Sequence, residues 1–340
     1  MGAPISQIDL DTQLVEAPET GRDGEQREVA GRSPAQIAWL RLRRDTVSMI
    51  ALGVCIVITL LAIAAPFLNS AGVLQPYEFH NNLVGGLGSM PTGPWGGMSW
   101  GHLFGVEPGT GRDVFSRVAL GISFSLLIAT AATVLSVVMG GVLGIISGYM
   151  GKGTDFWISR FMDLVLCFPQ TLMLLALSPV LKQRLSDLGI PGGPSGTPVS
   201  AVYLILVLGF FSGPYFGRII RGQVLSLRNR EFVEAARSLG AKRRRIWFQE
   251  LAPNLWAPLL VFASLTLPLN IGAEAALSYL GVGLQAPTPS LGNILSNSVN
   301  YYSADPAFFY LPGIALVLIV LSFNLLGDGL RDALDPKSTR

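Results

Sequence analysis

Six long stretches without a charged side chain constrain the fold of this 340-residue sequence more than any other feature. A helix needs about 20 apolar residues to cross the hydrocarbon core of a bilayer. A segment in lipid must also satisfy its own backbone hydrogen bonds, which a helix does. The charge-free stretches are 46–77, 118–151, 164–181, 188–217, 251–273 and 306–327. They predict an all-α integral membrane protein with six transmembrane helices, near 47–68, 122–146, 160–181, 201–221, 255–277 and 307–327.

Composition supports this class of protein. Half of the residues are hydrophobic and only 14% are charged. A soluble domain could not bury the apolar surface that such a composition produces. The stretch before the second span is longer than one crossing needs. We therefore expect part of 112–121 to lie along the membrane surface before the second helix enters the bilayer. No internal repeat is visible in the sequence.

The basic residues predict the orientation. Of 24 Lys and Arg, 20 fall in segments that share one side of the six-span topology, including nine within 218–245. Because cytoplasmic segments carry the excess of Lys and Arg, both termini are expected in the cytoplasm of a multi-pass protein of the cell (inner or plasma) membrane. The predicted domain plan begins with a disordered cytoplasmic tail (1–45), a first helix (46–68) and an extracytoplasmic loop (69–117). A five-helix transmembrane domain (118–328), with a coupling loop at 228–253, and a cytoplasmic C-terminal tail (329–340) follow.

The polar segment 231–254 separates the fourth and fifth spans. Four apolar residues in this segment have the spacing that places them on one side of a short helix. They are Phe232, Ala235, Ala236 and Leu239. Gly240 stands where such a helix needs a left-handed residue to end, and Pro253 is placed to open the next helix. The pattern predicts a bent helical element that a soluble partner grips at the membrane surface. The alternative is a basic cytoplasmic loop whose arginines only fix topology.

This segment resembles the EAA loop of ABC-importer permeases. The matching residues are Glu234-Ala235-Ala236, Gly240 and Pro253, while Ala252 stands where that family often has leucine. The resemblance implies a type I ABC importer permease fold. It also implies that these residues form coupling helices that dock on an ATP-hydrolysing subunit.

Further blocks resemble the dipeptide and oligopeptide permeases, of the second or C type. They are Gly111–Arg117 (GRDVFSR), Asp163–Pro169, Glu274–Asn293 and Phe323–Pro336. Asp113 in the first block can also cap the helix that follows. Just upstream, Gly105-Val106-Glu107 replaces the family's usual Gly-Thr-Asp. The resemblance implies three kinds of partner: a homologous B-type permease, two ABC ATPase subunits that hold ATP and Mg, and an extracytoplasmic substrate-binding protein.

Catalytic motifs are missing from the sequence. Gly151-Lys152-Gly153 lacks the hydroxyl residue and the earlier glycine of a Walker phosphate loop. We see no Ser/His/Asp set and no spacing typical of a metal site, so we expect a non-catalytic subunit without a cofactor of its own. The basic residues follow one membrane face, so the expected charged partner is the lipid bilayer and not nucleic acid.

Glu274 is the acid in the fifth span that most needs an explanation, because a charge within a span is expensive and often functional. It lies about 30 Å along the helix from the start of that span, near the outer mouth. Two roles are open: it meets the amino end of a peptide, or it braces the turn from Gly281 to Pro289. Glu274, Gly281 and Gly283 are the candidate residues of a pathway or outer gate.

The sequence thus predicts a permease subunit that forms half of the translocation pathway of an ATP-driven importer for dipeptides or oligopeptides. The first alternative is the same architecture importing nickel, glutathione or another small solute. A stand-alone secondary transporter is more remote, because it predicts repeated halves with broken helices. A membrane scaffold or intramembrane enzyme is a further alternative.

Overall fold

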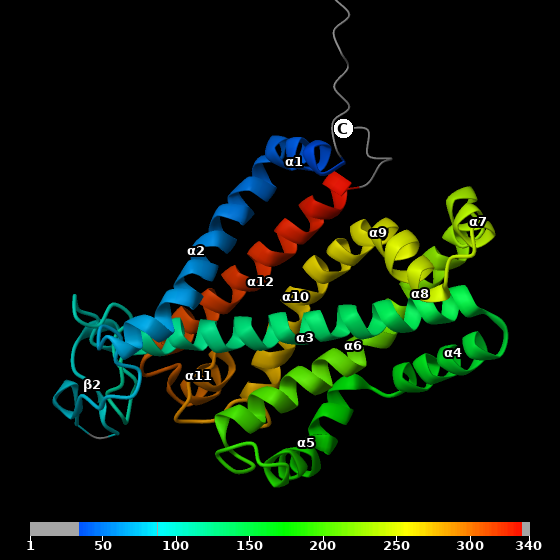
Figure 1. Cartoon of the computed structure of the whole chain (residues 1–340). Coiled ribbons are helices and arrows are strands. Elements are labelled where there is room, and N and C mark those ends of the chain that lie inside the picture. Colours follow the sequence, from blue (N-terminus) through cyan, green and yellow to red (C-terminus); the bar gives the residue numbers. More distant parts are fainter. Residues whose placement is uncertain (1–33, 87, 335–340) are drawn as a thin grey trace, which may run out of the picture. The chain divides into compact units, whose positions relative to one another are not determined.

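A computed structural model describes residues 34–86 and 88–334 of the chain. Helices form most of this part (Figure 1). The α-helices are α1 Pro34–Arg44, α2 Thr46–Ser70, α3 Val114–Met150, α4 Lys152–Cys167, α5 Gln170–Asp187, α6 Thr197–Leu227, α7 Glu231–Ser238, α8 Arg243–Arg245, α9 Ala252–Asn254, α10 Trp256–Tyr279, α11 Leu291–Ser298 and α12 Pro306–Leu334. The shorter elements are η1 Asn81–Leu83, β1 Val84–Gly85, β2 Met90–Pro91, η2 Pro94–Gly96, η3 Ile246–Leu251 and η4 Val299–Tyr301.

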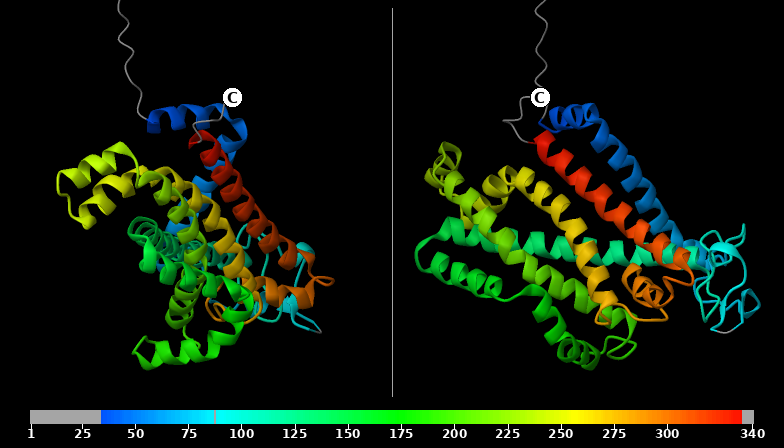
Figure 2. Two further views of the ribbon diagram at one scale, coloured as in Figure 1. Left: turned by 90° about the vertical axis from the view of Figure 1, so that its right-hand side faces the viewer. Right: turned by 180° about the vertical axis from the view of Figure 1, so that it is seen from behind.

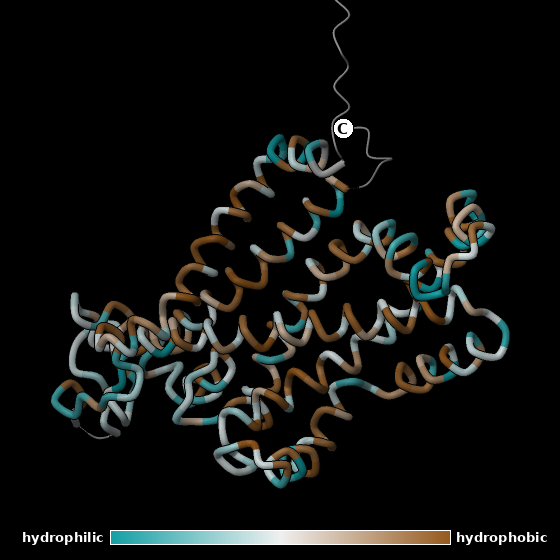
Figure 3. Tube along the Cα trace, in the orientation of Figure 1, coloured by the Kyte–Doolittle hydropathy of each residue, from teal (hydrophilic) through white to brown (hydrophobic). Residues whose placement is uncertain are grey.

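The predicted all-α membrane architecture is confirmed. Five helices in the described part are long and apolar enough to cross a membrane: α2, α3, α6, α10 and α12. The bent pair of α4 and α5 gives a sixth candidate when the two helices are counted as one broken span. Figure 3 shows hydrophobic residues along the long helices and hydrophilic ones around α7 and α8.

The third span differs from the single helix predicted over 160–181. It is broken between α4 and α5, which meet at 88°. Pro169 has no amide hydrogen to donate, and it disfavours the helical region for the residue before it. Phe168 accordingly adopts an extended conformation, with φ −83° and ψ 130°. The sequence contained the cause of the break, but the interpretation as one continuous helix was wrong.

The expectation that part of 112–121 lies along the membrane surface is also wrong. Residues from Val114 onward belong to one continuous helix, α3, which is about 56 Å long at 1.5 Å per residue. Nearly all side chains from Val114 to Ile122 are buried within the protein, so this part of α3 presents no free face to a membrane surface.

Helix α3 connects three hydrophobic clusters. Near its start, Val118 and Ile122 pack with side chains of α2, α10, α11 and α12. At its middle, Ile128 packs with α5, α6 and α10. Its last third, including Ile145, packs against a cluster formed by α6, α7, η3 and the start of α10. Figure 2 shows α3 and α6 running side by side, and this pair makes the most extensive helix contact in the described part.

The two ends of the described chain lie together. Ala38 and Leu42 of α1 pack with Ala333 of α12, as expected when the spans between them are even in number. The predicted disordered tail does not hold for 34–44, because this segment is α1; residues 1–33 lie outside the described residues. Helix α12 continues to Leu334, so the first part of the predicted C-terminal tail at 329–340 is helical, and its cytoplasmic location stays a prediction.

The segment between α2 and α3 is a loop with little regular structure, as its glycine and proline content predicts. It contains one two-stranded hairpin, in which Val84 pairs with Pro91. The loop ends at Asp113, whose carboxylate accepts a hydrogen bond from the Ser116 amide at 2.6 Å. The predicted helix cap at Asp113 is therefore confirmed.

Asp305 is a buried carboxylate directly before α12. Its Oδ1 accepts a hydrogen bond from the Phe308 amide at 3.4 Å, while Oδ2 has no partner in the described part of the chain. Burial raises the pKa of Asp305 above its usual 3.8, and the amides of Phe308 and Ala307 oppose this effect. The ionised carboxylate is thus held in a place that disfavours its charge.

We expect Asp305→Asn to be at least as stable as the wild type at neutral pH. The folded protein binds the Asp305 proton more tightly than the unfolded chain does, so its contribution to stability is greatest below pH 3.8 and falls as pH rises through the raised pKa. The stability difference between the two proteins should therefore shrink on acidification. Thermal unfolding of the purified chain over a pH series measures it; a difference independent of pH would contradict the assignment.

Candidate functional site

The segment 231–254 folds as the bent element that its sequence predicts, and we call it the α7–α9 element. Gly240 has φ +73°, in the left-handed region that favours glycine. The Ala241 amide donates to the Ala236 carbonyl and the Gly240 amide to that of Arg237, both at 3.0 Å. These bonds close α7 where the sequence places its end. Pro253 lies in the first turn of α9, just before α10, in agreement with its predicted position.

One side of the α7–α9 element is fixed to the transmembrane helices. Val233 is fully buried, in one cluster with Ile246 and Leu251 of η3 and with side chains of α6 and α10. The Arg237 guanidinium also lies over the Tyr149 ring of α3, 5.8 Å from its centre. The predicted apolar face needs one correction, because Ala236 packs toward this cluster and does not share the exposed surface.

The other side of the element is an exposed apolar surface. Leu239 is 88% exposed and Phe248 65%, and Phe232 and Ala235 are also exposed. Glu234, in the first turn of α7, is exposed as well. The sequence singled out Glu234, Ala235, Ala236, Gly240 and Pro253 for contact with an ATPase, and that role stays a prediction.

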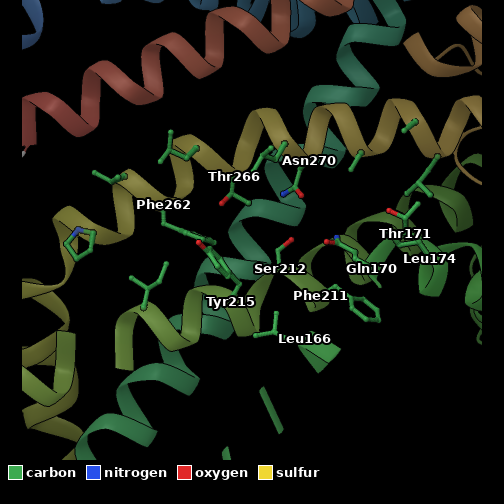
Figure 4. Close-up of a pocket in the computed structure, with 18 of the residues that line it drawn as sticks. Leu166, Gln170, Thr171, Leu174, Phe211, Ser212, Tyr215, Phe262, Thr266 and Asn270 are labelled. Carbon is green, nitrogen blue, oxygen red and sulfur yellow. The ribbon is translucent and has the colours of Figure 1, made fainter. Parts of the chain in front are cut away.

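A cavity of about 950 Å³ lies between α10 on one side and α5 and α6 on the other (Figure 4). We call it the central cavity. Much of its wall is apolar, with Leu174, Phe211 and Phe262 among the residues. Uncharged polar side chains from all three helices also line it: Gln170, Thr171, Ser212, Tyr215, Thr266 and Asn270. Such a mixture of apolar wall and few polar groups is typical of a small-molecule site.

Sequence reasoning missed the polar lining of this cavity. Asn270 gave one signal, since an amide in the middle of an apolar span is costly unless it is paired or functional. Its Nδ2 donates to Thr133 Oγ1 of α3 at 2.9 Å. Gln170 and Thr171 directly follow Pro169, so the break in the third span brings them to the cavity wall. Their position there depends on the bend and has no periodic signature.

Glu274 does not line the central cavity, although Ala273 and Leu277 on either side of it do. Its carboxylate is fully buried and accepts hydrogen bonds from Ser125 Oγ of α3 at 2.5 Å and from Ser278 Oγ at 2.7 Å. Ser278 Oγ in turn accepts from the Leu284 amide at 3.0 Å. Of the two roles considered for Glu274, these contacts have the geometry of a brace for the turn after α10.

Gly281 and Gly283 form that turn. Gly281 has φ +81°. A Cβ at Gly283 would lie only 2.6 Å from the Ser278 Cα, so the turn folds back on α10 too closely for a side chain. From α5, Lys182 Nζ donates to the Gly283 carbonyl at 3.3 Å. Neither glycine lines the cavity, and whether the turn gates a pathway stays a prediction.

The described residues contain no cluster of three or more His, Cys, Asp or Glu that could hold a metal ion. None of these residue types lines the central cavity, where Arg331 is the charged residue. The cavity wall can therefore donate hydrogen bonds to, and accept them from, an uncharged polar molecule.

Family models match two parts of the chain. One, described as the binding-protein-dependent transport system inner membrane component, matches residues 140–340. The other, described as the N-terminal TM domain of oligopeptide transport permease C, matches residues 33–83. The two matched regions include the predicted spans except for residues 114–139, which form most of α3.

The individual proteins that this chain resembles are also permease proteins of transport systems or a chain of an ABC transporter. The dipeptide transport system permease protein DppC of Alkalihalophilus pseudofirmus is 34% identical over 90% of each chain. The glutathione transport system permease protein GsiD of Salmonella typhimurium is 35% identical over 90% of this chain and 91% of its own. A chain of the MetNI methionine ABC transporter, solved in inward-facing conformations, has a TM-score of 0.51 at 18% identity and covers 64% of this chain and 96% of its own. The protein described above therefore belongs to the binding-protein-dependent transport system inner membrane components, with the fold of a type I ABC importer permease.

Proposed function

We propose that this chain is a permease subunit of an ATP-driven importer for dipeptides or oligopeptides. It forms half of the translocation pathway, and the other half comes from a homologous B-type permease. Two ATPase subunits bind ATP and Mg, and an extracytoplasmic binding protein delivers the substrate. The chain itself carries out no hydrolysis.

The observation that carries this proposal is the direct packing between the α7–α9 element and the cavity wall. Val233 of α7 shares a cluster with Phe216 and Ile220 of α6. The Phe216 ring stacks on that of Phe262 of α10, with 4.0 Å between their centres, and Phe262 lines the central cavity. Because packed cores transmit displacement, an ATPase that moves α7 also moves two walls of the cavity.

The exposed side of the same element supplies a docking surface for the ATPase. Leu239 and Phe248 project from an element whose other side is held by the transmembrane helices. Exposed apolar groups of this kind on a short rigid helix fit a partner's groove. Glu234 belongs to the same element, is exposed, and can pair with a basic residue of that groove.

The cavity lining favours a peptide over a metal ion. Amide and hydroxyl groups such as those of Asn270, Gln170 and Ser212 can pair with a peptide backbone without reading its side chains. Relatives named as dipeptide and oligopeptide permeases support this substrate class. Glutathione is a second candidate, because permeases named for its transport are about as similar to this chain.

The orientation proposed for the chain has both termini in the cytoplasm. The packing of α1 against the end of α12 supports their location on one side of the membrane. The concentration of basic residues in 218–245 supports the cytoplasmic choice. The α7–α9 element then lies where an ATPase can reach it.

A strain that lacks this chain should lose uptake of labelled dipeptides or oligopeptides and keep its uptake of labelled nickel. Uptake of labelled glutathione, measured in the same strain, separates the second candidate from the first. In proteoliposomes, uptake by the reconstituted complex should require ATP and proceed without an ion gradient, and the chain alone should not hydrolyse ATP.

Two results would contradict the proposal. Uptake driven by an ion gradient with the chain alone would identify a secondary transporter. Loss of nickel uptake with peptide uptake intact would show that the substrate class is wrong while the architecture stands.

A further inference from the structure

The loop between α2 and α3 carries a turn of unusual backbone geometry at 93–97. Trp95 has φ 54° and ψ 45°, in the left-handed region, and Gly93, Gly96 and Gly97 also have positive φ. For a residue other than glycine this conformation is unfavourable, because Cβ lies too close to the following carbonyl oxygen. It persists only where surrounding contacts impose it, and such residues are concentrated at functional positions.

Contacts on the inner side of the turn impose this shape. The Gly96 carbonyl accepts a hydrogen bond from the Val106 amide at 2.9 Å. Gly96 also lies against the buried Asp305 carboxylate so closely that an added Cβ would be 2.8 Å from its Oδ2. These contacts hold the turn on the side that faces the rest of the protein. Trp95, on the other side, is 70% exposed.

The exposed side chains of the turn face the beginning of α12. Together they enclose an apolar slot of about 570 Å³. Its lining is Trp95 and Met98 from the loop with Ala307, Tyr310, Leu311 and Ile314 from the first turns of α12. The Tyr310 hydroxyl and the Trp95 indole N–H are the polar groups on these side chains, and the rest of the lining is apolar, so the slot suits a hydrocarbon chain.

The slot is continuous with the membrane-facing surface of α12. Below it, this helix exposes an apolar stripe at helical spacing, with Ile314, Val317, Leu318 and Leu321. Because α12 is long and apolar enough to cross a membrane and little of it is buried within the chain, we expect this stripe to face hydrocarbon. Trp95 and Tyr310 stand at its upper end, where Trp and Tyr are enriched at the membrane–water interface.

We propose that this slot binds an acyl chain of a membrane phospholipid, with the 93–98 turn folded over the chain as a clamp. The second permease is a less suitable occupant. If it completes the pathway at the central cavity, as the proposed function implies, it lies elsewhere, because the cavity and the slot share no lining residue. Because the α2–α3 loop is extracytoplasmic in the proposed orientation, this acyl chain belongs to the outer leaflet. That placement rests on the proposed orientation; the nature of the ligand does not.

Quenching of tryptophan fluorescence by phosphatidylcholine brominated on its acyl chains tests the proposal. One variant keeps Trp95 and carries phenylalanine in place of the other five tryptophans, Trp39, Trp100, Trp157, Trp247 and Trp256. The matched variant keeps Trp100, which belongs to the same loop but is 98% exposed and outside the slot. In nanodiscs we expect brominated lipid to quench Trp95 several-fold more strongly than Trp100.

If quenching of Trp95 is equal to or weaker than that of Trp100, the proposal is wrong. Strong quenching in the isolated chain that disappears on assembly with the second permease would also overturn it, because protein would then fill the slot. If replacing five tryptophans at once prevents folding, the single variants Trp95→Phe and Trp100→Phe give the same comparison. In that case only Trp95→Phe should reduce the quenchable part of the emission.

Discussion

Replacing Gly240 by valine is expected to abolish ATP-driven uptake while the chain still inserts into the membrane. Gly240 has φ +73°, and no atom lies within 4 Å of the place where a Cβ would be added. The substitution therefore causes no clash, and its cost comes from the backbone, about 1–2 kcal/mol or more for a β-branched residue. The chain can relieve this strain by changing the end of α7, which displaces Leu239 from the exposed apolar surface. Uptake of labelled peptide and copurification of the ATPase subunits measure the effect.

Gly153→Val is the matched control for this experiment. Gly153 also has open space around it, but its φ is not positive, and valine has at least the helix propensity of glycine, so this substitution should not destabilise the helix. A companion variant, Glu234→Lys, reverses an exposed charge at the start of α7 and should also abolish uptake and weaken copurification. Unchanged uptake in both Gly240→Val and Glu234→Lys would refute the coupling role.

Gly140→Ala is expected to destabilise the protein by about 1–3 kcal/mol, the usual range for an overpacked core. Gly140, Gly144 and Gly148 recur every four residues on the face of α3 that meets α6. A Cβ at Gly140 would lie 2.9 Å from the Gly217 amide nitrogen. This neighbour is backbone and cannot turn aside, so the two helices must separate. Denaturant unfolding of the purified chain measures the change.

The neighbouring glycine on α3 provides the comparison. At Gly141 the nearest atom to an added Cβ is Leu259 Cδ2, at 3.8 Å, an ordinary contact. Gly141→Ala should therefore be neutral, or stabilising by about 0.4–1 kcal/mol because alanine restricts the unfolded chain. If the two variants lose stability equally, close packing between α3 and α6 is not the cause of the loss, because alanine has the higher helix propensity and only Gly140 is in tight contact with α6.

The α3–α6 contact illustrates what sequence reasoning can and cannot reach. Gly213 and Gly217 in the fourth span are of the residue type that permits close helix packing. Their partner at Gly140 lies on another span, more than 70 residues earlier. Small residues show that a helix can approach a neighbour, but they do not identify that neighbour. The pairing is a property of the packed protein.

Glu274 shows the same limit in a polar contact. Its position near one end of a span follows from counting residues along the helix. The direction of its carboxylate depends on Ser125, a residue 149 positions earlier in the chain. The Glu274 side chain does not line the central cavity, whereas Asn270, one turn earlier on the same helix, does.

The sequence by itself determined the membrane class, the approximate spans, the cap at Asp113 and the break in the bent element at Gly240. Each depends on local chemistry: apolar length, a side chain that bonds a nearby amide, or a residue that tolerates positive φ. Only the tertiary structure decided the 88° arrangement of the third span, the lining of the central cavity and the burial of Val233. These features depend on which faces of distant helices pack together, and that choice is made by the shapes of all the segments at once.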